Sequence, residues 1–152
     1  MTVTPEILKG MDLFEVLEVE ELADIAPLCS VEEFGGGQYV YREGDRAEKI
    51  YMVLEGRVAV EIEIRPGKRI VIYTETKGHM FGYPSLVRLN TFSTSTRCID
   101  KAKIVTMKAD ELVGKIFKPD CRRGYLVMNR LAEIIAVKLR ETRIQLVSLA
   151  HG

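Results

Sequence analysis

The spacing of apolar residues divides the chain into three segments, and the first of them reads as helical. From Thr4 to Leu28 the apolar positions recur mostly three or four residues apart, at Leu13, Phe14, Leu17, Leu22 and Ile25, which is typical of helices. Thr4 followed by Pro5 is a good helix start, since threonine caps the first turn and proline fits it. The acidic segment from Glu18 to Glu21 predicts a break, and therefore two short helices.

The middle segment, from Ser30 to Lys108, changes to a period of two, which is typical of β-strands. The alternating runs are centred on Tyr39–Tyr41, Ile50–Leu54, Val58–Ile64, Ile70–Tyr73 and Ile104–Met107. Turn sequences such as Glu55-Gly56 and Pro66-Gly67 separate them at short intervals, and no helical pattern fits between the strands. The pattern therefore predicts an α+β protein that is mainly β, with an antiparallel β-barrel or jelly roll.

The last segment predicts a long C-terminal helix from about Gly124 to Leu149. Its apolar residues form a heptad-like stripe and a second set on a neighbouring face, namely Met128, Leu131, Ile135, Leu139, Thr142, Leu146 and Leu149, and Val127, Ile134, Val137, Ile144 and Val147. One interpretation is a wide face that only covers the barrel. The other is a seam with a partner helix, which predicts a homodimer through Leu131, Ile135, Leu139, Thr142 and Leu146 or docking on another protein.

Length and charge bound the function. The 152 residues fit one domain, residues 1–152, with N-terminal helices over 4–28, a β-barrel over 30–108 and C-terminal helices over 109–149. Twenty-two basic residues balance twenty-two acidic ones, which argues against direct nucleic-acid binding. An odd set of three cysteines, no signal peptide and no apolar run long enough to span a bilayer predict a cytoplasmic protein with free thiols and no membrane partner.

Several spaced motifs carry a resemblance to a known family. They are Leu13-Phe14 with Leu17 and Glu20-Glu21-Leu22, Gly37 with Glu43-Gly44-Asp45, Tyr51 to Val60 around Gly56, and Gly78-His79-Met80-Phe81-Gly82. Their order, from about Asp12 to Leu149, resembles the cyclic-nucleotide-binding domain of catabolite-activator-type regulators, kinase regulatory subunits and cyclic-nucleotide-gated channels. The resemblance implies a ligand-responsive jelly roll that passes its signal through the C-terminal helix.

The resemblance also implies where a ligand binds. In the family the segment after Phe-Gly is a short helix whose backbone N–H groups, a Glu and an Arg receive the cyclic nucleotide. The corresponding candidate residues are Phe81, Gly82, Tyr83, Pro84, Ser85, Leu86, Phe92, Ser93 and Thr94. The family's Glu falls on Tyr83 and its Arg on Phe92. We therefore expect weak or no cyclic-AMP binding, and either an uncharged or apolar ligand or a pocket closed by its own side chains.

Three further features of this segment bear on the ligand. Pro84 would pre-set the first helical turn and leave the backbone donors of Ser85 and Leu86 facing the pocket. Arg88 either replaces the missing guanidinium or is a solvated loop residue. The run from Ser93 to Thr96 places hydroxyls on alternate faces of a strand, so that one set either lines the pocket or is ordinary strand polarity.

No other chemistry competes with this interpretation. The two histidines, His79 and His151, form no metal-ligand cluster, and His79 with Cys98 or Met80 is a poor haem pair, so neither a metal nor a cofactor is expected. The sequence contains no catalytic constellation, which predicts a non-enzyme. The function expected is a regulatory sensor domain with a small-molecule pocket or a degenerate one. The alternative is the effector half of a catabolite-activator-type transcription regulator without its DNA-binding domain.

Overall fold

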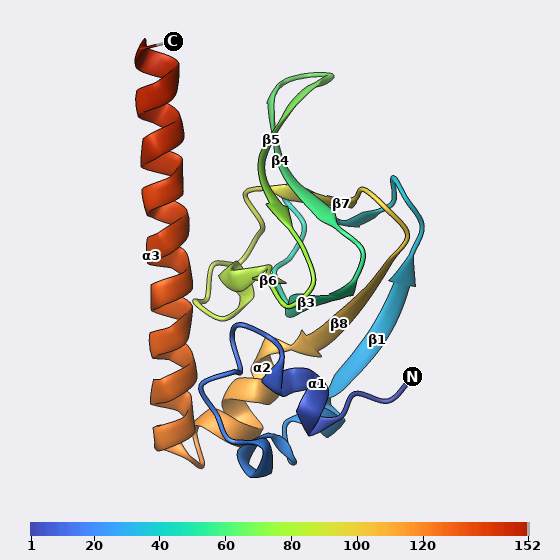
Figure 1. The fold of residues 1–152 in the computed structure, drawn as a ribbon, viewed down its shortest axis with the longest axis vertical. Helices are drawn as coiled ribbons and strands as arrows, with labels where there is room; N and C mark the ends of the chain where they lie inside the picture. The colour runs from blue at the N-terminus through green and yellow to red at the C-terminus, as the bar shows by residue number, and fades with distance from the viewer. Residues whose placement is uncertain (152) are drawn as a thin grey trace.

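Two four-stranded antiparallel sheets form the body of the molecule, and a long helix runs along one side of it (Figure 1). The computed structural model describes residues 1–151. The first sheet has the order β1-β8-β3-β6 and the second the order β2-β7-β4-β5. The strands are β1 (Cys29–Phe34), β2 (Tyr39–Tyr41), β3 (Lys49–Glu55), β4 (Val58–Arg65), β5 (Lys68–Glu75), β6 (Met80–Phe81), β7 (Ser95–Cys98) and β8 (Ala102–Lys108).

The predicted mainly-β fold is confirmed in its jelly-roll form, with two sheets rather than one closed barrel. Inward residues of both sheets meet in one apolar cluster, which contains Tyr41, Val53, Val58, Cys98 and Ile104. The alternation seen in the sequence explains this arrangement, because every second side chain of a strand points to the same face.

Gly56 allows the tight turn between β3 and β4. Its φ is +90°, a conformation that residues with a side chain rarely adopt. A Cβ atom there would lie 2.6 Å from the carbonyl oxygen of Lys101. The turn therefore needs glycine for its backbone conformation and for its close contact with the start of β8.

The N-terminal segment forms α1 (Pro5–Lys9) and two 3₁₀ turns, η1 (Val19–Leu22) and η2 (Ala26–Leu28). The hydroxyl of Thr4 accepts a hydrogen bond of 3.2 Å from the Ile7 N–H, so Thr4 caps α1 as predicted. The predicted division into short helices is confirmed, but the break lies between Lys9 and Val19 and not across the acidic segment. Glu18 and Glu21 form a reciprocal capping box that starts η1, because carboxylates near a helix start satisfy its free N–H groups.

The chain between β8 and the long helix is also helical. It consists of α2 (Ala109–Leu112), which continues as the π-helical turn η4 (Val113–Phe117). Buried side chains of both turns, such as Leu112 and Ile116, join the apolar cluster that lies beneath the first sheet.

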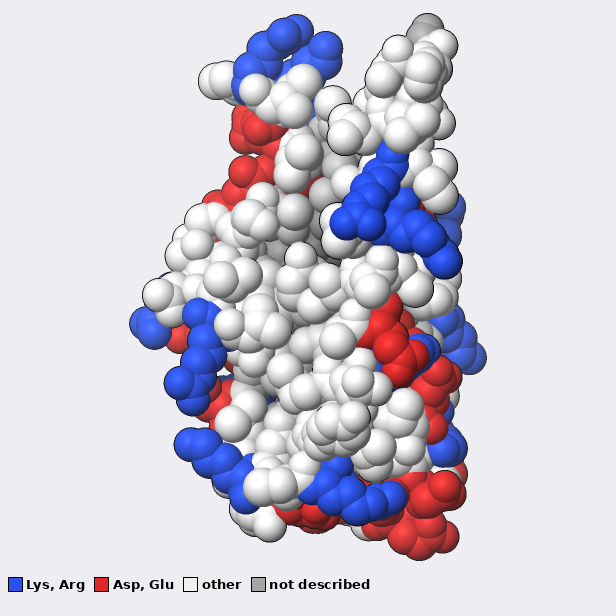
Figure 2. Space-filling view, turned by 90° about the vertical axis from the view of Figure 1, so that its left-hand side faces the viewer, with Lys and Arg blue, Asp and Glu red and all other residues white. Residues whose placement is uncertain are grey.

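Helix α3 (Cys121–His151) has a packed base and an exposed upper half. Gly124, Val127, Leu131 and Ile134 are buried on its base, and the helix begins slightly before the predicted Gly124. From Leu139 to His151 every residue is exposed, and Figure 1 shows this part rising alongside the β4–β5 hairpin. In the space-filling view the hairpin and the upper part of α3 form two separate projections (Figure 2).

Arg123 joins the base of α3 to the N-terminal segment. Its guanidinium bonds Asp24 at 2.6 Å, Asp120 at 2.7 Å and the carbonyl oxygen of Glu21 at 2.8 Å. These charge-assisted bonds fix the base of α3 against η1.

Candidate functional site

The predicted ligand segment forms one wall of a partly open cavity of about 240 Å³. This volume lies below the range of about 300–1,000 Å³ that is usual for small-molecule sites. Six of the nine predicted ligand residues line it, namely Phe81, Gly82, Tyr83, Pro84, Ser93 and Thr94. The remaining wall comes from β2, β4, β5 and α3, so the cavity lies where the second sheet, the ligand segment and the long helix meet.

Gly82 lets the ligand segment turn into the cavity wall. Its φ is +80°, and a Cβ atom there would lie 2.7 Å from the ring of Tyr51. The turn continues as the 3₁₀ helix η3 (Tyr83–Ser85). Its N–H groups are used internally, since Ser85 donates to the Gly82 carbonyl and Leu86 donates to that of Tyr83 at 2.9 Å. The expectation that these two donors face a ligand is therefore wrong.

Three of the predicted ligand residues lie away from the cavity wall. Ser85 points outward and its hydroxyl donates to the Lys49 carbonyl at 2.7 Å. Leu86 is buried in the apolar cluster beneath the first sheet. Phe92 is 3% exposed and stacks on Tyr41, with ring centroids 3.7 Å apart. An aromatic pair thus occupies the interior where the resemblance implied an arginine.

Of the four hydroxyl residues from Ser93 to Thr96, the first two lie at the cavity. Ser93 and Thr94 line the wall. Ser95 faces the other way, and its hydroxyl accepts a hydrogen bond of 3.0 Å from the Glu43 N–H. The alternate-face pattern therefore places only part of the run at the cavity.

Glu75 and Lys138 line the cavity and were missed in the sequence. Glu75 ends β5 and is 5% exposed, and its carboxylate forms an ion pair with the Lys138 ammonium from α3. The Lys138 nitrogen also lies 4.6 Å from the centre of the Tyr73 ring. The available signal was a lysine one turn beyond the buried Ile134 and two turns beyond the buried Leu131, on the face of the helix that turns toward the sheets.

A second polar contact joins the same two elements. The Tyr73 and Thr142 hydroxyls are 2.6 Å apart. Thr142, predicted to lie in a dimer seam, therefore contacts its own β5, as Lys138 does. Leu131, another predicted seam residue, is 1% exposed in the core of its own chain.

Burial controls the ionisation of these groups. Burial raises the pKa of the Glu75 carboxyl, although the neighbouring Lys138 acts in the opposite direction. Burial likewise raises the pKa of Tyr41 to about 12. A charged Glu75 thus depends on Lys138 for compensation, because an unpaired buried carboxylate is costly.

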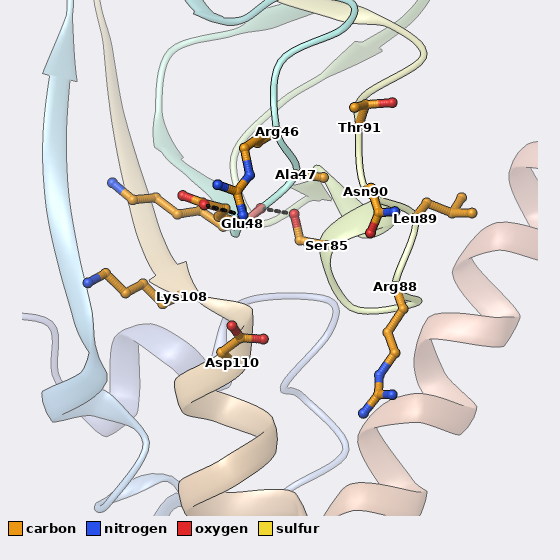
Figure 3. Close-up of a pocket in the computed structure, with 11 residues that line it drawn as sticks. Arg46, Ala47, Glu48, Ser85, Arg88, Leu89, Asn90, Thr91, Lys108 and Asp110 are labelled. Atoms are coloured by element: carbon orange, nitrogen blue, oxygen red, sulfur yellow. Dashed lines mark hydrogen bonds and ion pairs between the residues drawn. The ribbon is translucent and has the colours of Figure 1, made fainter.

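A larger polar groove of about 670 Å³ lies on the outer side of the ligand segment (Figure 3). Arg88 lines this groove and not the cavity, and its side chain points away from Arg46 and Thr91. Its φ of 58° is unusual for a residue with a side chain. Arg88 therefore does not replace the missing guanidinium, and Lys138 is the one cationic residue on the cavity wall within residues 1–151.

The described part of the chain offers neither a metal site nor a membrane-spanning helix. Among residues 1–151, no group of three or more His, Cys, Asp or Glu side chains is placed to hold a metal ion. In the same residues, none of the helices combines the length and the apolar character that crossing a bilayer requires.

Comparison with known proteins places this geometry in a family. The family model described as cyclic nucleotide-binding domain matches residues 31–118, more than half of the chain. A CRP-like cAMP-activated global transcriptional regulator of Mycobacterium tuberculosis is 23% identical over 145 residues, which are 95% of this chain and 62% of the regulator. The chain thus spans less than two thirds of that relative.

Solved structures agree in fold. Thermus thermophilus catabolite activator protein is 25% identical, with a TM-score of 0.75 over 91% of this chain and 63% of that one. A cyclic nucleotide-binding domain from Methylobacillus flagellatus shares the fold with a TM-score of 0.84, at 16% identity, over 97% of this chain and 86% of that one. The chain belongs to the cyclic nucleotide-binding domain family.

Proposed function

We propose that the chain is a regulatory sensor domain without enzymatic activity, in which a small molecule in the inner cavity changes how α3 contacts a partner. The observation that carries this proposal is the double connection of β5 to α3 at the cavity. The Glu75–Lys138 ion pair and the Tyr73–Thr142 hydrogen bond both lie beside the space that a ligand would fill. A ligand that disturbs either contact alters the position of the helix.

The proposed output is a homodimer formed by the upper half of α3. Leu139, Leu146 and Leu149 are 48%, 67% and 81% exposed, and such a row of apolar side chains usually marks an interface. Their spacing suits a second copy of the same helix. The proposed place of action is the cytoplasm, which the odd number of cysteines supports.

Cyclic AMP is not the proposed ligand. Tyr83 replaces the carboxylate that would accept a ribose hydroxyl, and the buried Phe92 replaces the arginine that would bind the phosphate. The cavity of about 240 Å³ is also small for a nucleotide. We therefore propose a smaller ligand that occupies the same place in the fold.

Calorimetric titration of cyclic AMP and cyclic GMP into the chain tests the ligand part of this proposal. The expected result is no binding in the micromolar range or tighter. A Tyr83→Glu, Phe92→Arg variant that remains folded should bind more tightly than the wild type. Micromolar binding by the wild-type chain would contradict the proposal and restore a cyclic nucleotide as the ligand.

A second candidate function is the effector half of a DNA-binding regulator. It is favoured by the M. tuberculosis relative, which matches 95% of this chain along only 62% of its own length. The length of the open reading frame distinguishes the two candidate functions. An open reading frame that continues past Gly152 into a DNA-binding domain, with promoter binding by its product, would support the second one.

A further inference from the structure

The ligand class can be narrowed from the charges on the cavity wall. Glu75 and Lys138 are the only charged residues on that wall in the described part of the chain, and they are paired with each other. Their side chains are 7% and 18% exposed. If one of the two side chains loses its partner, water can therefore solvate the remaining charge only poorly.

The pair also lies between the cavity and a hollow on the protein surface. Glu75 and Lys138 line the cavity on one side and a surface hollow of about 350 Å³ on the other. A ligand that reaches the cavity from this hollow meets the carboxylate and the ammonium first.

Four classes of ligand differ in what they do to the pair. An anion that takes Lys138 leaves Glu75 buried without a partner, and a cation that takes Glu75 leaves Lys138 in the same state; both are unfavourable. An uncharged ligand leaves the pair closed and gains no charged contact from it. A ligand that carries both charges replaces one ion pair by two, so each buried group keeps a partner.

The rest of the wall requires an apolar body. Phe81, Tyr83 and Pro84 on the ligand segment face Val60 and Ile72 of the second sheet across the cavity. The volume of about 240 Å³ is about that of eight water molecules, which suits a compact molecule with a single apolar group.

We propose that the cavity binds a small zwitterion of the α-amino-acid type, with its carboxylate on Lys138, its ammonium on Glu75 and its apolar side chain against Phe81 and Tyr83. This inference rests on the proposed sensor function and adds the ligand class to it. Binding by this route inserts the ligand between β5 and α3, at the contact through which the proposed signal passes.

Calorimetry of the full chain with four matched probes tests the inference. The probes are L-phenylalanine, 3-phenylpropionate, 2-phenylethylamine and benzyl alcohol, which carry both charges, the anion, the cation and neither. The expected result is that L-phenylalanine binds at least about tenfold more tightly than each of the other three. Equal or tighter binding of any other probe would overturn the inference.

Two variants show whether the preference comes from the pair. Glu75→Gln, Lys138→Met removes both charges and should abolish the preference for L-phenylalanine. Arg57→Met, Asp100→Asn removes an exposed ion pair at another place, with N–O distance 2.7 Å, and should keep it. If the first variant does not fold, the wild-type probe series alone decides.

The outcomes separate this inference from the proposed function. Tight binding of benzyl alcohol or of one singly charged probe overturns the zwitterion and leaves a small-molecule sensor. Failure of all four probes also overturns the zwitterion, whereas the sensor function is tested separately by the cyclic-nucleotide titrations and by the oligomeric state.

Discussion

Glu75 at the end of β5 and Lys138 in the middle of α3 form a buried ion pair that belongs both to the cavity wall and to the packing of the helix. Beyond this point α3 has no further buried residue among those described. The pair and the Tyr73–Thr142 hydrogen bond one turn further along α3 thus attach the helix to β5 next to its exposed upper half. In the proposed mechanism, a ligand that separates the pair frees the upper half of α3 to bind a partner.

The pair predicts non-additive effects on stability. Glu75→Gln or Lys138→Met alone should lower the free energy of unfolding by about 3–5 kcal/mol, because each leaves one buried charge uncompensated. The double substitution should cost less than either single one. Urea unfolding of the wild type, the two single variants and the double variant measures these free energies. Single effects that simply add would show that the two charges are not coupled.

Asp12 gives a prediction for pH. Its carboxylate accepts a hydrogen bond of 3.1 Å from the Met80 N–H, and an asparagine oxygen can accept the same bond. Burial raises the pKa of Asp12 above the model-peptide value of 3.8, against the opposing effect of His79. The native state therefore holds this proton more tightly than the unfolded chain, so the contribution of Asp12 to stability falls as pH rises above 3.8.

Urea unfolding at several pH values tests this sign. The stability of the wild type relative to Asp12→Asn should decrease as pH rises from about 4 to 7. Asp24 is the matched control, since its hydrogen bond to Arg123 lowers its pKa. The stability of the wild type relative to Asp24→Asn should increase as pH rises through the acidic range. The same direction for both variants would contradict the assignment.

The stacked pair of Phe92 and Tyr41 predicts a structural role for Phe92. Phe92→Ala should lower the free energy of unfolding by about 3–5 kcal/mol, because it removes a buried ring and leaves a cavity. Tyr125, which is 69% exposed on α3, provides an aromatic control, and Tyr125→Ala should change stability by less than about 0.5 kcal/mol. Thermal and urea unfolding measure both. An equal effect of the two substitutions would contradict the packing described.

The cysteines predict an order of reactivity. Cys121 is exposed at the start of α3, Cys29 is half-buried and Cys98 is buried. Burial raises the pKa of Cys29 to about 12 and also raises that of Cys98, so both remain thiols at neutral pH. Ellman's reagent should therefore modify Cys121 at least about tenfold faster than the other two. Cys121→Ser should remove the fast phase, and its persistence would contradict this order.

The fold followed from local patterns, whereas the site depended on long-range packing. Alternation over residues 30–108 and the turn at Gly56 specify strands and hairpins, because the backbone conformation depends on neighbours in sequence. The environment of Lys138 depends on the surface against which α3 packs. The environment of Phe92 depends on how the loop between η3 and β7 packs. No local pattern predicts the ion pair of Lys138 with Glu75, which is 63 residues away in the sequence. The same holds for the stacking of Phe92 on Tyr41. Both are consequences of how the two sheets and α3 assemble.

The same reason explains the mixed outcome for the predicted seam. Periodicity alone placed Leu131, Ile135, Leu139, Thr142 and Leu146 on one stripe. In the structure the lower part of that stripe packs on its own chain, with Leu131 buried and Ile135 half-buried. Only the upper leucines remain open to a partner. A test at Ile135 would therefore mix an effect on folding with an effect on association.

The last prediction is that the chain forms a homodimer through the upper half of α3. Leu139 and Leu146 are one heptad apart, about 10.5 Å along the helix axis, and 48% and 67% exposed. In a symmetric pair each would meet its counterpart on the second helix.

Burial of each leucine is worth about 1.5–3 kcal/mol, and four such side chains enter the interface. Leu139→Glu, Leu146→Glu should therefore give a monomer at about ten micromolar with an unchanged fold, since neither residue belongs to the core. Val16→Glu, on an apolar surface residue outside α3 that is 38% exposed, should remain dimeric. Sedimentation velocity of the three proteins decides, because a monomeric wild type or a dimeric double variant would each reject this interface.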